Sequence, residues 1–295
     1  MSANRFKGTG VALITPFKAD KSIDFHALEN LVDSVIAGGV DYLVALGTTA
    51  ETPTLSEAEK QDILINIIEK NQQRVPLVCG IGGNNTQEIL HRLESYPLEK
   101  VDAILSVTPY YNKPSQAGLL AHYQAINKHT PKPLILYNVP GRTGCNMLPD
   151  TTLNIAAECE QVIGIKEASG NMVQCMELVK KRPKHFTLLS GDDNLVLPQI
   201  ACGFDGVISV AANCFPTLFT DMVKHSLTHA FTHAQKLHYQ LLDGVDLLFA
   251  EGNPAGVKAV LSALGMIENE LRLPMTPVSY ATQEKIKQFL KVLHD

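Results

Sequence analysis

The sequence lacks the features that would direct its 295 residues to a membrane, to nucleic acid or out of the cell. No apolar run approaches the ~18 residues of a membrane span, and residues 1–8 lack the apolar core of a secretory signal. No basic tail or block of like charge occurs, and the net charge of -5 gives no reason to expect nucleic-acid binding. These absences predict a cytoplasmic protein that binds neither membranes nor nucleic acid.

Cysteine is present, but never in a spacing typical of zinc binding or redox chemistry. There is no CxxC pair and no zinc-ribbon pattern. The cysteines are Cys79, Cys145, Cys159, Cys175, Cys202 and Cys214. Most stand in apolar surroundings, which predicts small core side chains in a reducing compartment.

Short apolar runs alternate with helical patterns along most of the chain. Eight runs are predicted as strands: residues 11–14, 42–46, 76–79, 103–107, 134–137, 162–166, 186–189 and 206–210. Helical patterns between them include residues 24–37, 56–71, 86–95 and 149–159. Eight strands that alternate with helices predict a parallel sheet, and closure of that sheet gives an α/β fold, the TIM (β/α)8 barrel. The alternative is an open doubly wound sheet, but no glycine-rich phosphate turn follows the first run.

The residues after the eighth run have helical periodicity and few strand signals. Residues 217–228, 230–249 and 253–264 are predicted helices. We interpret them as the last barrel helix and a small C-terminal helical appendage. The predicted organisation is a catalytic barrel over residues 1–225 and a C-terminal helical region over residues 226–295.

Lys166 ends the apolar run 162–165, which is typical of a fully buried parallel strand. Lysine is rarely buried unless a partner or a reaction uses it. Loss of solvation favours the neutral amine, which attacks carbonyl carbons and forms a Schiff base. The alternative is a lysine that reaches solvent or pairs with Glu167.

Several polar side chains follow the other predicted strands, at the end where TIM barrels carry their active sites. They are Thr48 and Thr49, Tyr110 and Tyr111, Tyr137, Arg142, and Asp192 with Asp193. Each has a purely structural alternative, such as a turn, a rim contact or a surface arginine. The two aspartates are predicted to cap the next helix.

Taken together, these residues suit Schiff-base chemistry on an acidic substrate. Formation and dehydration of a carbinolamine move several protons, which Tyr137 can carry with a hydroxyl chain through Thr48 and Tyr111. The turn at Thr48 and Thr49 can hold the carboxylate of a keto acid with backbone N–H groups. Arg142 offers a fork of donors to a second acidic substrate.

Four segments resemble the dihydrodipicolinate synthase family, which belongs with N-acetylneuraminate lyase to the pyruvate-dependent class I aldolases. They are GTTAE (47–51), YYNKP (110–114), YNVPGRT (137–143) and IKEA (165–168). The resemblance extends from Gly10 to Pro277. It implies a lyase that condenses pyruvate with L-aspartate 4-semialdehyde, the first committed step of diaminopimelate and lysine biosynthesis.

The resemblance also implies a role for each matching residue and no metal or organic cofactor. Lys166 would form the Schiff base with pyruvate, Tyr137 would be the acid and base, and Thr48 would pass protons. Tyr111 would complete the relay in a neighbouring subunit, which implies a homotetramer built as a dimer of dimers. Substrate contacts would come from Thr49 and Ile208 to pyruvate, Gly191 beside the site, and Arg142 to the semialdehyde.

Many members of this family bind lysine as a feedback inhibitor. Asn84, Glu88 and Tyr110 match that site, whereas Glu57 and Lys60 replace histidines commonly found there. Lys60 would place a second ammonium near that of the ligand. The sequence therefore predicts weak or absent lysine inhibition.

Two alternatives remain at this point. One is a related aldolase that acts on a sugar acid or N-acetylneuraminate, although Arg142 suits an acidic substrate better than a polyol. The other is a metal-binding barrel, because His225, His229 and His233 recur every four residues and would share one helix face. A solvated histidine face is the simpler interpretation, since no carboxylate or cysteine joins them.

Overall fold

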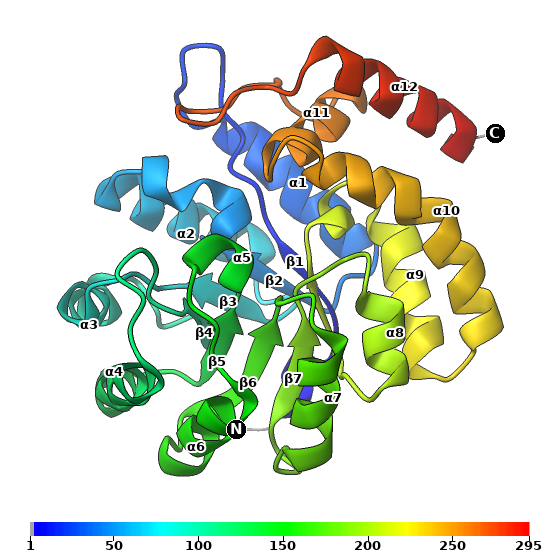
Figure 1. Cartoon of the computed structure of the whole chain (residues 1–295). Helices are drawn as coiled ribbons and strands as arrows, with labels where there is room; N and C mark the ends of the chain where they lie inside the picture. Colours follow the sequence, from blue (N-terminus) through cyan, green and yellow to red (C-terminus); the bar gives the residue numbers. More distant parts are fainter. Residues whose placement is uncertain (1–2, 295) are drawn as a thin grey trace.

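The chain forms a closed barrel of eight parallel strands in a computed structural model that describes residues 3–294 (Figure 1). The strands follow chain order around the barrel, and β1 pairs with β8 to close it. They are β1 (Gly8–Ala12), β2 (Tyr42–Ala45), β3 (Leu77–Gly80), β4 (Ala103–Val107), β5 (Leu134–Asn138), β6 (Val162–Glu167), β7 (Thr187–Ser190) and β8 (Gly206–Ser209). The predicted TIM barrel is confirmed, and the largest shift is at β1, which begins and ends earlier than its apolar run.

Helices surround the barrel and connect successive strands (Figure 1). The barrel helices are α1 (Phe25–Ala37), α2 (Glu57–Asn71), α3 (Thr86–Ser95), α4 (Gln116–His129), α5 (Pro140–Thr143), α6 (Pro149–Glu158), α7 (Met172–Lys181), α8 (Val196–Ala201) and α9 (Pro216–Leu227). Short 3-10 helices are η1 (Ala3–Phe6), η2 (Thr48–Ala50), η3 (Thr52–Thr54) and η4 (Ala211–Asn213). Ser56 starts α2 through a capping box, in which Glu59 N donates to Ser56 Oγ and Ser56 N donates to Glu59 Oε2.

Three further helices form the predicted C-terminal appendage. They are α10 (Phe231–Phe249), α11 (Ala255–Ala263) and α12 (Tyr280–His294), which lie together along one side of the barrel in Figure 1. The predicted boundary between residues 225 and 226 falls in the last turn of α9, and residues 1–2 and 295 lie outside the described chain. The division into two regions stays a prediction. No helix of residues 3–294 combines the length and apolar character needed to cross a bilayer.

Strand side chains alternate between the barrel interior and the surrounding helices. The outer shell packs against the helices, as with Val11, Leu43 and Ile104. A smaller inner cluster fills the barrel and includes Val44, Leu105, Ile135, Tyr137, Leu189 and Ile208. A register shift in the pairing of β5 with β6 brings Tyr137 opposite Lys166, so both lie at the carboxyl end of the barrel.

Candidate active site

Lys166 is buried at the carboxyl end of β6, beside Tyr137 on the neighbouring strand β5. Its side chain is 5% exposed, and Nζ lies 4.4 Å from the centroid of the Tyr137 ring. Within the described chain Lys166 makes no ion pair and no hydrogen bond through its side chain. The face of the phenol ring favours its positive charge, and the carboxylates of Asp192 and Asp193 attract the ammonium without forming an ion pair.

Glu167 does not neutralise Lys166, so the structural alternative suggested by the sequence is wrong. Successive residues of a strand face opposite sides, and the Glu167 carboxylate accepts from Asn138 Nδ2 (3.0 Å), Gln174 Nε2 (3.2 Å) and Ser169 N (2.8 Å). Burial raises the pKa of Glu167, while these hydrogen bonds act in the opposite direction. The hydrogen bonds hold the outer face of β6 in place and leave Lys166 facing the barrel.

A cavity of about 540 Å³ lies above Lys166 and Tyr137. Its walls also include Thr48 from η2, Tyr110 from the loop after β4 and Arg142 from α5. Four predicted active-site residues therefore meet in one cavity. Arg142 is exposed, and its side chain has no hydrogen bond or ion pair within the described chain, so its guanidinium can bind a ligand carboxylate.

Three other predicted residues, Gly191, Ile208 and Thr49, do not line this cavity, and Gly191 is partly exposed. A Cβ on Gly191 would lie 2.9 Å from Lys166 Cε and 2.5 Å from Ala168 Cβ, so only glycine leaves room for the lysine. Ile208 is fully buried in the inner cluster. Thr49 is also buried, and its hydroxyl accepts a hydrogen bond from Asn253 Nδ2 (3.0 Å).

Tyr111 does not join the other predicted catalytic residues. Its side chain is 88% exposed, and the part of the cavity wall contributed by this loop is Tyr110. The backbone of Tyr111 has φ 73°, and Lys113 nearby has φ 47°. Non-glycine residues with such angles carry strain of about 1 kcal/mol or more each, so this loop holds an exposed phenol in a costly conformation.

The sequence predicted that Asp192 and Asp193 cap the next helix, but neither caps α8, so this prediction is wrong. The Asp193 carboxylate is buried and accepts from Val210 N (2.9 Å) and Ala211 N (2.8 Å), just beyond β8. Asp192 accepts from Gly170 N (3.2 Å), in the loop after β6. Burial raises the pKa of Asp193 to about 6. The two aspartates connect the loops that follow β6, β7 and β8.

A polar cluster also lines this cavity. Lys60, Arg92 and Tyr96 contribute to the wall, and all three bind Glu57, at 2.7, 3.1 and 2.7 Å respectively. Burial alone would raise the pKa of Glu57, but these hydrogen bonds lower it to about 2. The sequence singled out Glu57 and Lys60 but not Arg92 or Tyr96, because no motif connects α3 to α2.

The other residues matched to a lysine site lie at the surface next to this cluster. Asn84 and Glu88 are exposed. Asn84 Nδ2 donates to the carbonyl oxygen of Tyr110 at 3.4 Å, and Asn85 Nδ2 donates to Glu88 Oε1 at 3.1 Å. Tyr110 is the one residue of the three that also lines the cavity.

The three spaced histidines do not share one helix, so that part of the metal-site alternative is wrong. α9 ends at Leu227, and His229 turns the chain with φ 61° before α10 begins at Phe231. The rings of His225 and His233 stack with centroids 5.4 Å apart. Over residues 3–294, no group of three or more histidine, cysteine or acidic side chains is arranged to hold a metal.

One ion pair near the site was not predicted. Lys258 on α11 and Glu51, which follows η2, are both buried and lie 2.5 Å apart between Nζ and Oε1. The available signal was a lone lysine inside the apolar stretch 255–261, which is the same kind of signal that drew attention to Lys166. Its partner Glu51 belongs to the GTTAE segment but offers no pattern of its own.

Comparisons with known proteins identify the family of this chain. A model described as the dihydrodipicolinate synthetase family matches residues 5–293. The chain is 49% identical to a 4-hydroxy-tetrahydrodipicolinate synthase of Parabacteroides distasonis, over 99% of each chain. Among solved structures, the synthase of Cyanidioschyzon merolae with lysine bound is 32% identical with a TM-score of 0.94, over 98% of this chain and 99% of that chain.

A second solved structure, described as the first monomeric dihydrodipicolinate synthase variant, is 37% identical with a TM-score of 0.96. The match covers 99% of this chain and 98% of that chain. Sequence and structure thus agree over nearly the full length of each protein. The chain belongs to the dihydrodipicolinate synthetase family.

Proposed function

We propose that this protein is a lyase that condenses pyruvate with L-aspartate 4-semialdehyde and gives 4-hydroxy-tetrahydrodipicolinate, at the start of diaminopimelate and lysine biosynthesis. The observation that carries the proposal is Lys166, which is buried beside Tyr137 under an open cavity and makes no ion pair within the described chain. Family membership supports the same reaction and favours it over the sugar-acid alternative.

Lys166 acts as the nucleophile. Its neutral amine attacks the keto carbon of pyruvate, and the carbinolamine loses water to give an imine. Loss of a proton from the methyl group gives an enamine, which attacks the aldehyde carbon of the second substrate. The amino group of that substrate then displaces Lys166 as the ring closes, so the lysine is released unchanged. The imine is itself the electron sink, and the reaction needs no metal or organic cofactor.

Tyr137 moves the protons of these steps, and Thr48 passes them along. The phenol lies against the lysine side chain, where it can give a proton to the departing water and take one back. Thr48 shares the cavity with both residues. Arg142, whose guanidinium is free of protein partners in the described chain, binds the carboxylate of the semialdehyde. Thr49, Ile208 and Gly191 shape the pyruvate site.

Tyr111 completes the proton relay in the site of a second copy of the chain. Its exposure and its strained backbone support this role, because a partner that buries the phenol would repay the strain. We therefore expect a dimer at least, and a homotetramer built as a dimer of dimers. A monomeric variant exists among the solved relatives, so the assembly is tested by light scattering and by the activity of Tyr111→Phe.

Lysine inhibition is weak or absent in this protein. Asn84, Glu88 and Tyr110 match the lysine site of the family. The Glu57 carboxylate, however, already binds Lys60, Arg92 and Tyr96. A lysine ligand would have to approach the Lys60 ammonium or break this cluster. An inhibition constant for lysine below about 1 mM would contradict this part of the proposal.

We also propose a cytoplasmic location. Five cysteines are buried and Cys202 is partly exposed, which fits their predicted role as small core side chains.

The proposed reaction is tested by reduction with borohydride in the presence of pyruvate. Peptide mass spectrometry should find Lys166 heavier by the mass of pyruvic acid less one oxygen atom. Tyr137→Phe is a useful companion, because it keeps the amine and removes the phenolic hydroxyl. No adduct, or an adduct on another lysine, would overturn the mechanism.

A further inference from the structure

The unpredicted lysine, Lys258, is the more completely buried of the two lysines near the site. Its side chain is 0% exposed. Nζ lies 2.5 Å from Glu51 Oε1, donates to the carbonyl oxygen of Glu270 at 2.9 Å, and lies 4.1 Å from the centroid of the Phe17 ring. Separation of the two side chains would leave two uncompensated buried charges. The pair therefore fixes Glu51 to α11 in the C-terminal region.

Glu51 ends the turn that carries Thr48 into the cavity. Both residues that flank this turn have left-handed backbones, with φ 56° at Leu46 and φ 54° at Glu51. Neither is glycine, so the surrounding structure must hold each of them in place. A Cβ on Gly80 would lie 2.2 Å from Leu46 O, which shows how closely β3 packs against the first of the two strained residues.

Two side chains and one backbone N–H from outside the turn fix its later residues. Thr15 Oγ1 donates to the carbonyl oxygen of Ala50 at 2.8 Å, and Asn253 Nδ2 donates to Thr49 Oγ1 at 3.0 Å. Arg272 N donates to Glu51 Oε2 at 3.1 Å. Asn253 and Arg272, like Lys258, belong to the C-terminal region, so that region supplies most of these contacts.

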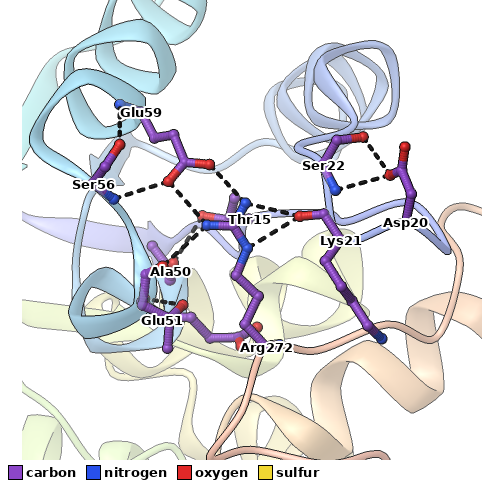
Figure 2. A network of polar contacts seen from close by, with 10 residues as sticks. Thr15, Asp20, Lys21, Ser22, Ala50, Glu51, Ser56, Glu59 and Arg272 are labelled. Atoms are coloured by element: carbon purple, nitrogen blue, oxygen red, sulfur yellow. Dashed lines mark hydrogen bonds and ion pairs between the residues drawn. The ribbon is translucent and has the colours of Figure 1, made fainter.

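Arg272 extends the same attachment to the start of α2 and to the loop after β1 (Figure 2). Its guanidinium donates to both carboxylate oxygens of Glu59, at 2.6 and 2.9 Å, and to the carbonyl oxygens of Lys21 (2.8 Å) and Thr54 (3.0 Å). In Figure 2 the arginine lies between Glu59 and Lys21. The C-terminal segment thus holds the loop that contains Thr48 from Thr49 to the start of α2.

We infer that the Glu51–Lys258 ion pair is a positioning device that sets the Thr48–Thr49 turn to receive the carboxylate of pyruvate. The inference rests on the proposed function for the identity of the ligand. Neither Glu51 nor Lys258 is a catalytic residue, because both act through the backbone of the turn. The C-terminal region is then part of the pyruvate site as well as an addition to the barrel.

The test uses Glu51→Gln and the double variant Glu51→Gln/Lys258→Met. The single variant leaves Lys258 buried without its partner and could fold poorly, whereas the double variant has neither charge. Both should raise the KM for pyruvate about tenfold and leave the KM for the semialdehyde within about twofold. Because Thr48 lies on the same turn, kcat should fall by less than the KM for pyruvate rises. Amide hydrogen exchange of the peptide over residues 46–55 should become faster in both variants.

The matched control is Asp205→Asn, at the opposite end of the barrel. Asp205 is buried, pairs with Arg182 and accepts from Leu188 N at 3.1 Å. This variant should lose stability but keep the wild-type KM for pyruvate and the wild-type exchange of residues 46–55. An unchanged KM in both Glu51 variants, or an equal rise in the control, would overturn the inference. The absence of a pyruvate adduct in the wild-type protein would refute the proposed function. Unchanged amide hydrogen exchange of residues 46–55 in the Glu51 variants would refute the positioning role, whatever the outcome of the adduct experiment.

Discussion

The active-site cavity and the C-terminal attachment each contain a buried lysine, and the two lysines differ in their partners. Lys166 and Lys258 both lie over an aromatic face, at 4.4 Å from Tyr137 and 4.1 Å from Phe17. Lys258 also has the Glu51 carboxylate and the Glu270 carbonyl, whereas Lys166 has neither kind of partner within the described chain. Burial alone therefore does not identify a nucleophile, because a fully paired lysine is held in its charged form for structure.

The charges around Lys258 show how closely the two effects are balanced there. Burial lowers its pKa to about 8, and the attraction of Glu51 acts in the opposite direction. Near neutral pH the ammonium therefore remains paired. Lys166 has no carboxylate in ion-pair contact and lines an open cavity, where a carbonyl substrate can reach the amine.

The largest expected effect is that of Lys166→Met, which tests whether the unpaired lysine is the nucleophile. We expect kcat to fall by at least about 10⁴-fold, because the variant has no amine beside Tyr137 to form the imine. Stability should change little, because the variant loses the attraction of Asp192 and Asp193 but no longer buries an ammonium. Turnover and urea unfolding measure the two effects. A borohydride-trapped pyruvate adduct on Lys258 in this variant would contradict the distinction between a nucleophilic Lys166 and a structural Lys258.

The next largest effect is expected from Tyr137→Phe, which keeps the aromatic face and removes the hydroxyl. If the phenol moves protons, kcat should fall by about 1,000-fold with little change in the KM for pyruvate. The control is Tyr42→Phe, deeper in the barrel, where the hydroxyl donates to the carbonyl oxygen of Val207 at 3.1 Å. That variant should lose stability and keep its kcat, and equal losses of kcat in both would contradict the role of Tyr137.

Lys258→Met tests the other side of the comparison, with stability as the measured quantity. The single variant leaves Glu51 buried without its partner, and we expect the free energy of unfolding to fall by about 3 kcal/mol. Addition of Glu51→Gln should recover much of this loss, since the second charge is then gone. Urea unfolding of the single and double variants measures the coupling. Equal stability of the two variants would show that the pair is not coupled.

The sequence predicted the barrel because strand burial leaves a direct pattern. Eight apolar runs at regular spacing correspond to eight parallel strands, and one of them carries Lys166 at its end. Lys258 gave a similar local signal inside an apolar helix. Its importance was missed because Glu51 is distant in the chain, and a pairing across such a separation leaves no local pattern.

Helix ends and loop contacts could not be predicted with the same success. The spacing of His225, His229 and His233 suggested one helix, but His229 adopts φ 61° and separates α9 from α10. Asp193 follows β7 as a helix cap would, yet it binds the backbone after β8. In both cases tertiary contacts decide, and a single segment of sequence does not contain them.

The smallest predicted effect concerns the Arg272–Glu59 pair, which supports the Lys258 side of the comparison. The hydrogen bond from Arg272 is the main cause that lowers the pKa of Glu59 to about 2, from an ordinary 4.5. A carboxyl group with a lowered folded-state pKa stabilises the protein above pH 4.5, and this contribution is lost as the pH falls from about 4.5 towards 2. Glu59→Gln should therefore lower the free energy of unfolding by about 2 kcal/mol at pH 7.

The pH dependence of that difference separates the ion pair from the capping role of the same side chain. Glutamine can still accept from Ser56 N, so only the charged part of the loss should shrink below pH 4.5. Urea unfolding of both proteins at pH 7, 4.5 and 3.5 measures it, with Glu284→Gln as the control, because Glu284 pairs with Lys287 on the exposed face of α12. A difference that stays constant from pH 7 to 3.5 would mean that the Arg272–Glu59 charge pair does not stabilise the attachment, and that the buried pair at Lys258 holds the C-terminal segment without it.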